Sequence, residues 1–198
     1  MTGVTGKDEI KLLDIERTTQ PLLGQFGIVF MPETLDHAGY QLVSAALVKG
    51  RAIFPKKPLA LWCNGRGGTV DAALALVDLI QSDGNIDGIL IGHVSSAHSV
   101  VWAACLRRYT YPNAALQVHQ AKGWESRYMN EDAYAINARE IAKDNQTLAR
   151  IYAGASNRSA SWWLKRLKMV SHEDIVRLKA DKLINDLDMA KPIRKRKS

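Results

Sequence analysis

The chain has 198 residues and a hydrophobic fraction of 46%, which suits one globular domain with a large core. Its formal net charge is +7, but much of the excess lies in the tail 191–198 and in the stretch 165–168. No aromatic-interleaved basic strand or recognition-helix pattern accompanies this charge, so we interpret the tail as solvated rather than as a binding arm and expect no nucleic-acid partner.

The sequence shows neither a membrane-spanning nor a secretory pattern. No run of apolar residues approaches the roughly 18 needed to span a bilayer. The first residues carry acids and bases without the apolar core of a signal peptide. We therefore expect a cytoplasmic protein without membrane contact. Cys63 and Cys105 lie in apolar surroundings and form no CxxC pair, which predicts buried free thiols.

Strand and helix patterns alternate along the first half of the chain. We expect an N-terminal arm over 1–25, a strand over 26–31, a turn at 32–35, a helix that ends near Gly50, a buried strand over 59–63, a helix capped by Thr69 and a strand over 86–91. This order predicts right-handed βαβ units and a mostly parallel sheet.

The second half continues the pattern within a single domain that we place at 26–190. We expect a helix over 100–106 that ends at Arg107-Arg108, short strands over 109–111 and 115–119, a long helix over about 130–152, a helix containing Trp162 and Trp163, a capping box at 171–174 and a closing strand at 183–184.

A polar turn, Gly92-His93-Val94-Ser95-Ser96-Ala97-His98-Ser99, lies between an expected buried strand and an expected buried helix. A serine in such a turn would lie near backbone N–H groups and the positive end of the helix dipole, which suits a nucleophile. Taken alone, the segment is better explained by serines that cap the helix. His98 lies two residues past Ser96 and could influence this site, but a histidine at a helix start is more often one that faces solvent or packs, and we expect that here.

A glycine-rich turn, Gly65-Arg66-Gly67-Gly68, follows the expected strand over 59–63. It lacks the Lys-Ser/Thr of a phosphate-binding loop and the spacing of a dinucleotide fingerprint. Glycine allows the backbone to approach a reacting carbonyl closely. A tight turn and a set of backbone N–H donors therefore both remain open as interpretations.

Three blocks follow one another along the chain: Asn64-x-x-Gly67-Gly68, Gly92-x-x-x-Ser96, and Pro112-Asn113-x-x-x-x-x-His119-Gln120. Together they resemble the proteolytic subunit of the Clp protease (ClpP), over about 26–186. The crotonases of the same superfamily share the architecture but not this serine and histidine pairing. The resemblance implies an α/β fold of ClpP/crotonase-like repeated β-β-α (βαβ) units, with a mostly parallel sheet and a protruding long helix.

The resemblance also implies roles for individual residues. Ser96 is the nucleophile, and His119 is the general base that takes the hydroxyl proton and returns it to the leaving group. The N–H groups of Gly68 and Ala97 hold the oxyanion. The attacked group is a peptide or ester carbonyl.

The segment 121–126 corresponds to a glycine-rich strand that pairs with the substrate backbone in the family. Gly123 and Trp124 are the expected substrate-binding residues, and Trp124 would narrow the substrate choice or block it. His93 and His98 make no recognised metal pattern. We assign no metal and no other cofactor.

The acid that should orient the base is missing from the expected position. The family has Arg-Asp-x-(Phe/Met)-x-Ser before its last helix, and the matching stretch, 166–171, places Leu167 where the aspartate belongs. Loss of this carboxylate lowers turnover in serine proteases by on the order of 10⁴. Glu173 and Asp174 lie nearby, but a capping box explains them without catalysis.

Three functions therefore stay open. The leading one is a ClpP-like serine endopeptidase that cleaves unfolded polypeptides or peptides inside a ring chamber. By resemblance it forms heptameric rings, stacked as a tetradecamer with the long helix between the rings, and works with an ATP-dependent unfoldase. The alternatives are a catalytically inactive subunit that shapes or regulates a ring, and a peptidase of phage or mobile-element origin that needs no unfoldase.

Overall fold

A parallel sheet forms the centre of the computed structural model, which describes residues 22–111, 113–123, 130–156 and 158–169. Its strands are β1 (Ile28–Phe30), β3 (Leu59–Gly65), β5 (Ile86–Ser95), β6 (Arg107–Thr110) and β7 (Ala115–Gln117). The order is β1-β3-β5-β6, and β7 also pairs with β5, beyond the end of β6. Every pairing in this sheet is parallel, which confirms the predicted topology.

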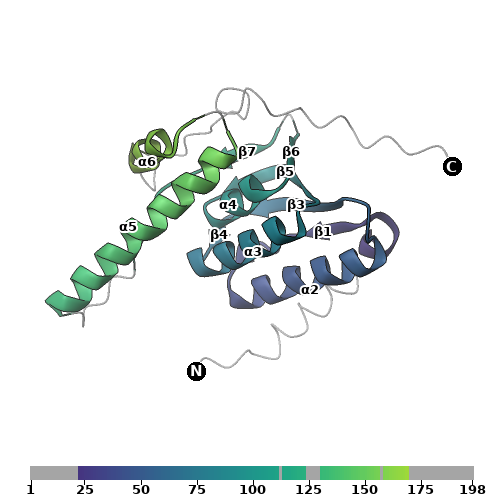
Figure 1. Ribbon diagram of the computed structural model, residues 1–198, viewed down its shortest axis with the longest axis horizontal. Coiled ribbons are helices and arrows are strands. Elements are labelled where there is room, and N and C mark those ends of the chain that lie inside the picture. The colour runs from purple at the N-terminus through teal and green to yellow at the C-terminus, as the bar shows by residue number, and fades with distance from the viewer. Residues whose placement is uncertain (1–21, 112, 124–129, 157, 170–198) are drawn as a thin grey trace.

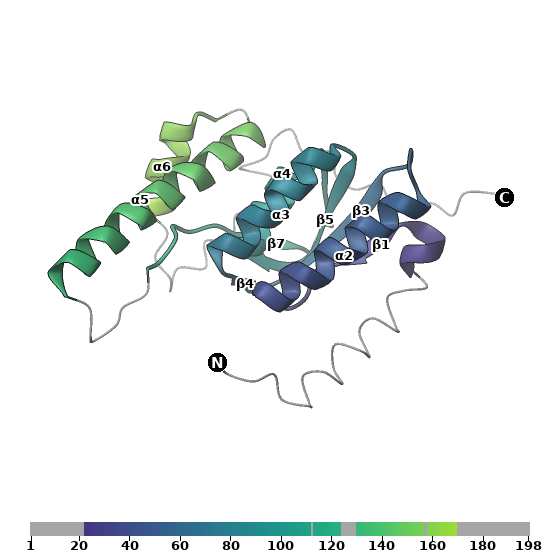
Figure 2. The same cartoon turned by 60° about the horizontal axis from the view of Figure 1, so that its bottom comes forward.

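The helices pack against one another in chain order, as Figures 1 and 2 show. They are α2 (His37–Ile53), α3 (Val70–Asp83), α4 (Ala97–Ala104), α5 (Glu131–Gly154) and α6 (Ala160–Met169). Helix α5 extends well beyond the sheet, and α6 lies alongside it. The predicted protruding long helix is therefore confirmed. Among the helices that the structure describes, none is long and apolar enough to cross a membrane.

The core lies between the sheet and the helices, and both cysteines belong to it. The inward-facing residues of β3 and the apolar residues of α4 other than Ala104 are almost completely buried. Cys63 and Cys105 are buried and free, as predicted. Burial raises the pKa of the Cys105 thiol to about 12, so this thiol stays protonated and unreactive at neutral pH.

Side-chain caps fix the starts of two helices that position the site. The Thr69 hydroxyl accepts a hydrogen bond from the Ala72 N–H at 3.3 Å, and the Asn130 amide oxygen accepts one from the Ala133 N–H at 2.9 Å. Both residues satisfy N–H groups that the first turn of a helix leaves without partners. These caps confirm the predicted starts of α3 and α5.

Glycine at position 50 was misread as the end of a helix. Helix α2 continues past it to Ile53, and residues 22–26 are helical where an extended arm was expected. A Cβ on Gly50 would lie 2.9 Å from the Leu23 side chain and 3.1 Å from that of Leu59. The glycine is therefore required by close packing against these neighbours and does not terminate the helix.

The arginine pair was also misplaced. Helix α4 ends at Ala104, and Arg107 and Arg108 lie in β6. Arg107 contacts Asp87 of the neighbouring strand at 2.7 Å. Arg108 still reaches the end of the helix, because its guanidinium donates to the Cys105 carbonyl at 2.6 Å.

The expected capping box at 171–174, the strand at 183–184, the tail and Trp124 lie outside the described residues.

Candidate active site

The turn around Ser96 is much tighter than the sequence indicated. Strand β5 runs to Ser95 and helix α4 begins at Ala97, so Ser96 alone joins them. Its φ of 54° makes it the one non-glycine residue with positive φ in the described ranges. Such a backbone costs about 1–3 kcal/mol and persists only where its surroundings enforce it. Here the Ser96 N–H donates to the Gln117 carbonyl at 3.1 Å, and the Ser96 carbonyl accepts from the Ser99 N–H at 2.9 Å.

The neighbouring serines have structural hydrogen bonds. The buried Ser95 hydroxyl donates to the Gln117 amide oxygen at 2.9 Å. The buried Ser99 hydroxyl donates to the Ser96 carbonyl at 2.6 Å and shares a second bond of 2.6 Å with the Tyr152 hydroxyl of α5. The Ser96 side chain makes no cap hydrogen bond. Ser96 thus occupies the N-cap position of α4, but the expected capping by its hydroxyl is not observed.

The glycine-rich segment Gly65–Gly68, here called the glycine strip, forms part of a short strand pair. Strand β2 (Thr34–Leu35) pairs in parallel with β4 (Gly67–Gly68), where the sequence analysis expected turns. A Cβ on Gly67 would lie 2.5 Å from the Ser96 Cβ, and one on Gly68 would lie 1.8 Å from the Leu35 carbonyl oxygen. Only glycine lets the strip run this close to both the serine and β2.

His119 follows β7 and is half-buried. Its Nδ1 lies 2.7 Å from the Gln120 carbonyl oxygen. Because a carbonyl oxygen can only accept, this hydrogen bond places the proton on Nδ1 and the ring lone pair on Nε2. A base that is to take a proton through Nε2 needs this tautomer.

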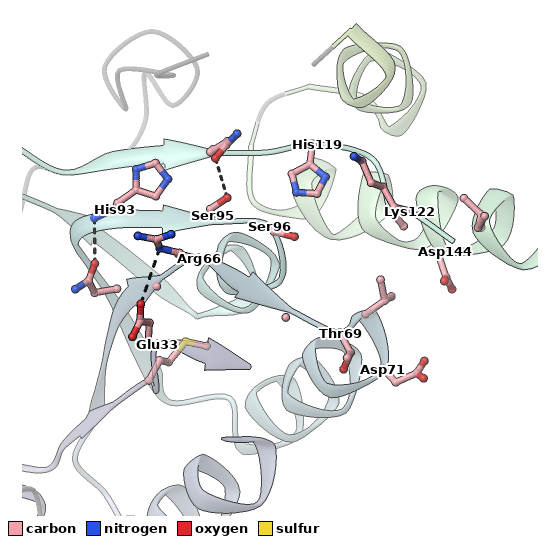
Figure 3. Close-up of a pocket in the computed structure, with 18 of the residues that line it drawn as sticks. Glu33, Arg66, Thr69, Asp71, His93, Ser95, Ser96, His119, Lys122 and Asp144 are labelled. Atoms are coloured by element: carbon pink, nitrogen blue, oxygen red, sulfur yellow. Dashed lines mark hydrogen bonds and ion pairs between the residues drawn. The ribbon is translucent and has the colours of Figure 1, made fainter. Parts of the chain in front are cut away.

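Ser96 and His119 line one open pocket of about 1420 Å³ (Figure 3). Gly68 and Gly123 also line it. Ala97, the residue after Ser96, is buried at the start of α4. The structure thus brings together the described site residues that were predicted from regions far apart in the sequence.

Carboxylates in the pocket were missed by the sequence analysis. The acidic lining residues are Glu33, Asp71, Glu140 and Asp144. Burial raises the pKa of Asp144, and the charges of Asp71 and Glu140 raise it further. Asn137, Glu140, Ile141 and Asp144 all line the pocket from α5, and they recur at helical spacing. That spacing in the sequence could have shown that these residues lie on one face of the helix.

Leu167 lies in α6, fully buried in the hydrophobic core. It does not belong to the pocket lining in the part of the chain that the structure describes. The position that the resemblance associates with the acid is therefore a packing position here.

The family model described as Clp protease matches residues 15–171. The chain belongs to the Clp protease family. A similar relative is the ATP-dependent Clp protease proteolytic subunit 4, chloroplastic, of Arabidopsis thaliana, which is 28% identical over 153 residues. The alignment covers 76% of this chain and 52% of that protein, so the chain spans about half the length of the curated relative. The predicted Clp protease family and its fold are confirmed.

Proposed function

We propose that this member of the Clp protease family is a serine endopeptidase in which Ser96 is the nucleophile and His119 the general base. The observation that carries the proposal is the enforced positive φ of Ser96. The Ser96 hydroxyl makes no helix-cap hydrogen bond, and Ser96 lines the same pocket as His119. A strained serine between a strand and a helix is the arrangement that nucleophilic turns use.

The reaction follows from this arrangement. Nε2 of His119 accepts the Ser96 proton while Oγ attacks the carbonyl carbon of a peptide bond, and the proton then passes to the leaving amine. The N–H groups of Gly68 and Ala97 stabilise the oxyanion. Water hydrolyses the acyl-enzyme by the same route in reverse. The Gln120 carbonyl orients Nδ1, as the carboxylate does in a Ser-His-Asp triad.

The substrate in this proposal is an unfolded polypeptide or a peptide that lies along the segment after His119. Gly123 lines the pocket and would pair with the substrate backbone, as strand addition requires. Trp124 stays a prediction as the second substrate-binding residue. The cytoplasmic location also stays a prediction, and the Arabidopsis thaliana relative is named as chloroplastic.

A catalytically inactive ring subunit is the second candidate. The buried Leu167 favours it, because the resemblance offers no other acid for His119. A neutral carbonyl stabilises an imidazolium less well than a carboxylate does. A peptidase that works without an unfoldase is a variant of the first candidate and has the same site.

Labelling by a fluorophosphonate probe tests the proposal, because the probe reacts with an activated serine. We expect labelling of the parent at Ser96 and none of Ser96→Ala. Ser95→Ala is the matched control, since Ser95 lines the same pocket but is bonded to Gln117; this variant should still be labelled. A folded parent that is never labelled, or a Ser96→Ala protein that hydrolyses peptides like the parent, would contradict the peptidase proposal.

Assembly into heptameric rings, stacked as a tetradecamer, is proposed from family membership. The projection of α5 from the sheet supports it (Figure 2), as do the exposed apolar side chains of Tyr134 and Ile136 on that helix. An ATP-dependent unfoldase is the proposed partner, consistent with the name of the relative.

Sedimentation velocity of the parent protein tests the assembly. We expect a species whose mass is a multiple of seven chains. Exchanging both Tyr134 and Ile136 for serine should shift the distribution toward smaller species, since exposed apolar side chains drive association. A stable monomer at high concentration would contradict the ring.

A further inference from the structure

His98 is a buried polar residue with a specific partner. It lies in α4, two residues after Ser96, and its exposed fraction is 0%. Its Nε2 lies 2.7 Å from the Pro32 carbonyl oxygen, which belongs to a segment 66 residues earlier in the chain. Since the carbonyl can only accept, Nε2 carries the proton and donates it.

The imidazole also contacts the glycine strip. A Cβ on Gly65 would lie 2.5 Å from His98 Nε2 and 2.9 Å from its Cδ2, so the strip lies against this edge of the ring. The Gly67 carbonyl also raises the pKa of the His98 ring. The ring atom Nδ1 nevertheless makes no hydrogen bond with the described residues. The ring therefore fills the space between the strip and the Pro32 carbonyl.

The segment 32–35, whose Pro32 carbonyl accepts the hydrogen bond from His98, is also hydrogen-bonded to the region of the glycine strip. The Arg66 N–H donates to the Glu33 carbonyl at 3.1 Å, and the Thr69 N–H donates to the Leu35 carbonyl at 2.9 Å. Hydrogen bonds thus lead from His98 to Pro32, and from the 33–35 segment to Arg66 within the strip and to Thr69 directly after it. The strip in turn packs against Ser96 through Gly67.

An apolar side chain would fill this space without leaving a polar atom unsatisfied. His98 Nδ1 is buried and makes no hydrogen bond with the described residues, which is unfavourable for a polar atom in a protein interior. Burial lowers the pKa of His98, while the Pro32 and Gly67 carbonyls oppose that shift. The ring is therefore neutral at neutral pH, and its N–H donor is what distinguishes it from an apolar residue.

We propose that His98 is a positioning residue for the proposed active site: its Nε2–H bond to Pro32 fixes the 32–35 segment, and through it the glycine strip that carries the Gly68 oxyanion donor. The inference rests on the peptidase function proposed above. Misplacing a catalytic group by about 1 Å lowers turnover by roughly 10²-fold, and this sets the size of the expected effect.

The test compares His98→Met, which fills the space without a donor, with His98→Gln, whose amide can donate to the Pro32 carbonyl. His98→Met should slow fluorophosphonate labelling of Ser96 and lower kcat by roughly 10²-fold, with KM nearly unchanged. His98→Gln should recover most of both rates. Equal losses in the two variants, or no loss in His98→Met, would overturn the inference.

Trp102→Phe is the matched control. It removes another buried hydrogen bond from the same helix, in which Trp102 Nε1–H donates to the Gly88 carbonyl at 3.2 Å. Gly88 lies far along β5 from Ser96. It should lower the melting temperature but leave labelling and kcat near the parent values. If Trp102→Phe slows labelling as much as His98→Met does, the effect of His98 is merely one of helix stability and the inference fails.

Hydrogen exchange of peptides spanning 64–69 gives a readout that needs no activity. Exchange should be faster in His98→Met and close to the parent rate in His98→Gln and Trp102→Phe. An unlabelled parent would contradict the peptidase proposal alone, whereas unchanged exchange in His98→Met would overturn the role of His98.

Discussion

Replacing His119 with glutamine is expected to lower peptide hydrolysis by on the order of 10²–10⁴-fold, which is the contribution that a general base typically makes. Glutamine keeps a similar length and can donate to the Gln120 carbonyl, but its amide does not take a proton at neutral pH. The Ser96 hydroxyl then has no base, so fluorophosphonate labelling should fall with hydrolysis. Steady-state kinetics with a fluorogenic peptide and the labelling rate measure the two effects.

His93→Gln is the control for this experiment. His93 lines the same pocket, but its backbone N–H is what binds Asn64, at 3.1 Å, so loss of the imidazole leaves that contact in place. We expect hydrolysis within a few-fold of the parent. If His93→Gln loses activity and His119→Gln keeps it, the base has been assigned to the wrong histidine.

The second large effect is expected from Gly67→Ala. Gly67 has a φ of 114°, and a Cβ there would lie 2.5 Å from the Ser96 Cβ and 3.0 Å from its Oγ. The alanine side chain must push the strip away from the serine or the serine out of its turn. We expect hydrolysis to fall to background. The free energy of unfolding should fall by about 2–5 kcal/mol, from the sum of backbone strain and overpacking.

Gly84→Ala is the control that introduces backbone strain without a steric clash. Gly84 also has a positive φ, of 67°, but the nearest atom to its Cβ would be the Gln81 carbonyl oxygen at 3.9 Å. Urea unfolding should show a loss of about 1 kcal/mol from the backbone alone, with hydrolysis unchanged. Full activity in Gly67→Ala would mean that the strip does not need its present distance from Ser96.

The parts of the fold that were predicted correctly depend on local signals. The apolar runs of β3 and β5 identify buried strands, and Thr69 and Asn130 mark helix starts through side chains that bond three residues ahead. Strand-helix alternation then restricts the topology to parallel units. Within the site, the Clp protease motifs supplied Ser96 and His119, which composition and periodicity alone would not have paired.

The parts that were missed depend on contacts between distant segments. Strands β2 and β4 have two residues each, too few for any periodic pattern, and they exist because they pair with each other. The role of Gly50 depends on Leu23 and Leu59. The partner of His98 is a backbone carbonyl, which no residue type indicates.

Tyr152 connects the longest helix to the chemistry of the turn. Its buried hydroxyl is bonded to Ser99, and the Ser99 hydroxyl is bonded to the Ser96 carbonyl. Burial raises the pKa of Tyr152, so this relay of hydroxyl groups keeps its protons across the physiological range. These hydrogen bonds therefore connect α5 directly to the Ser96 carbonyl. Because α5 also extends well beyond the sheet, the helix that projects from the sheet and the strained backbone of Ser96 are joined by one chain of hydrogen bonds.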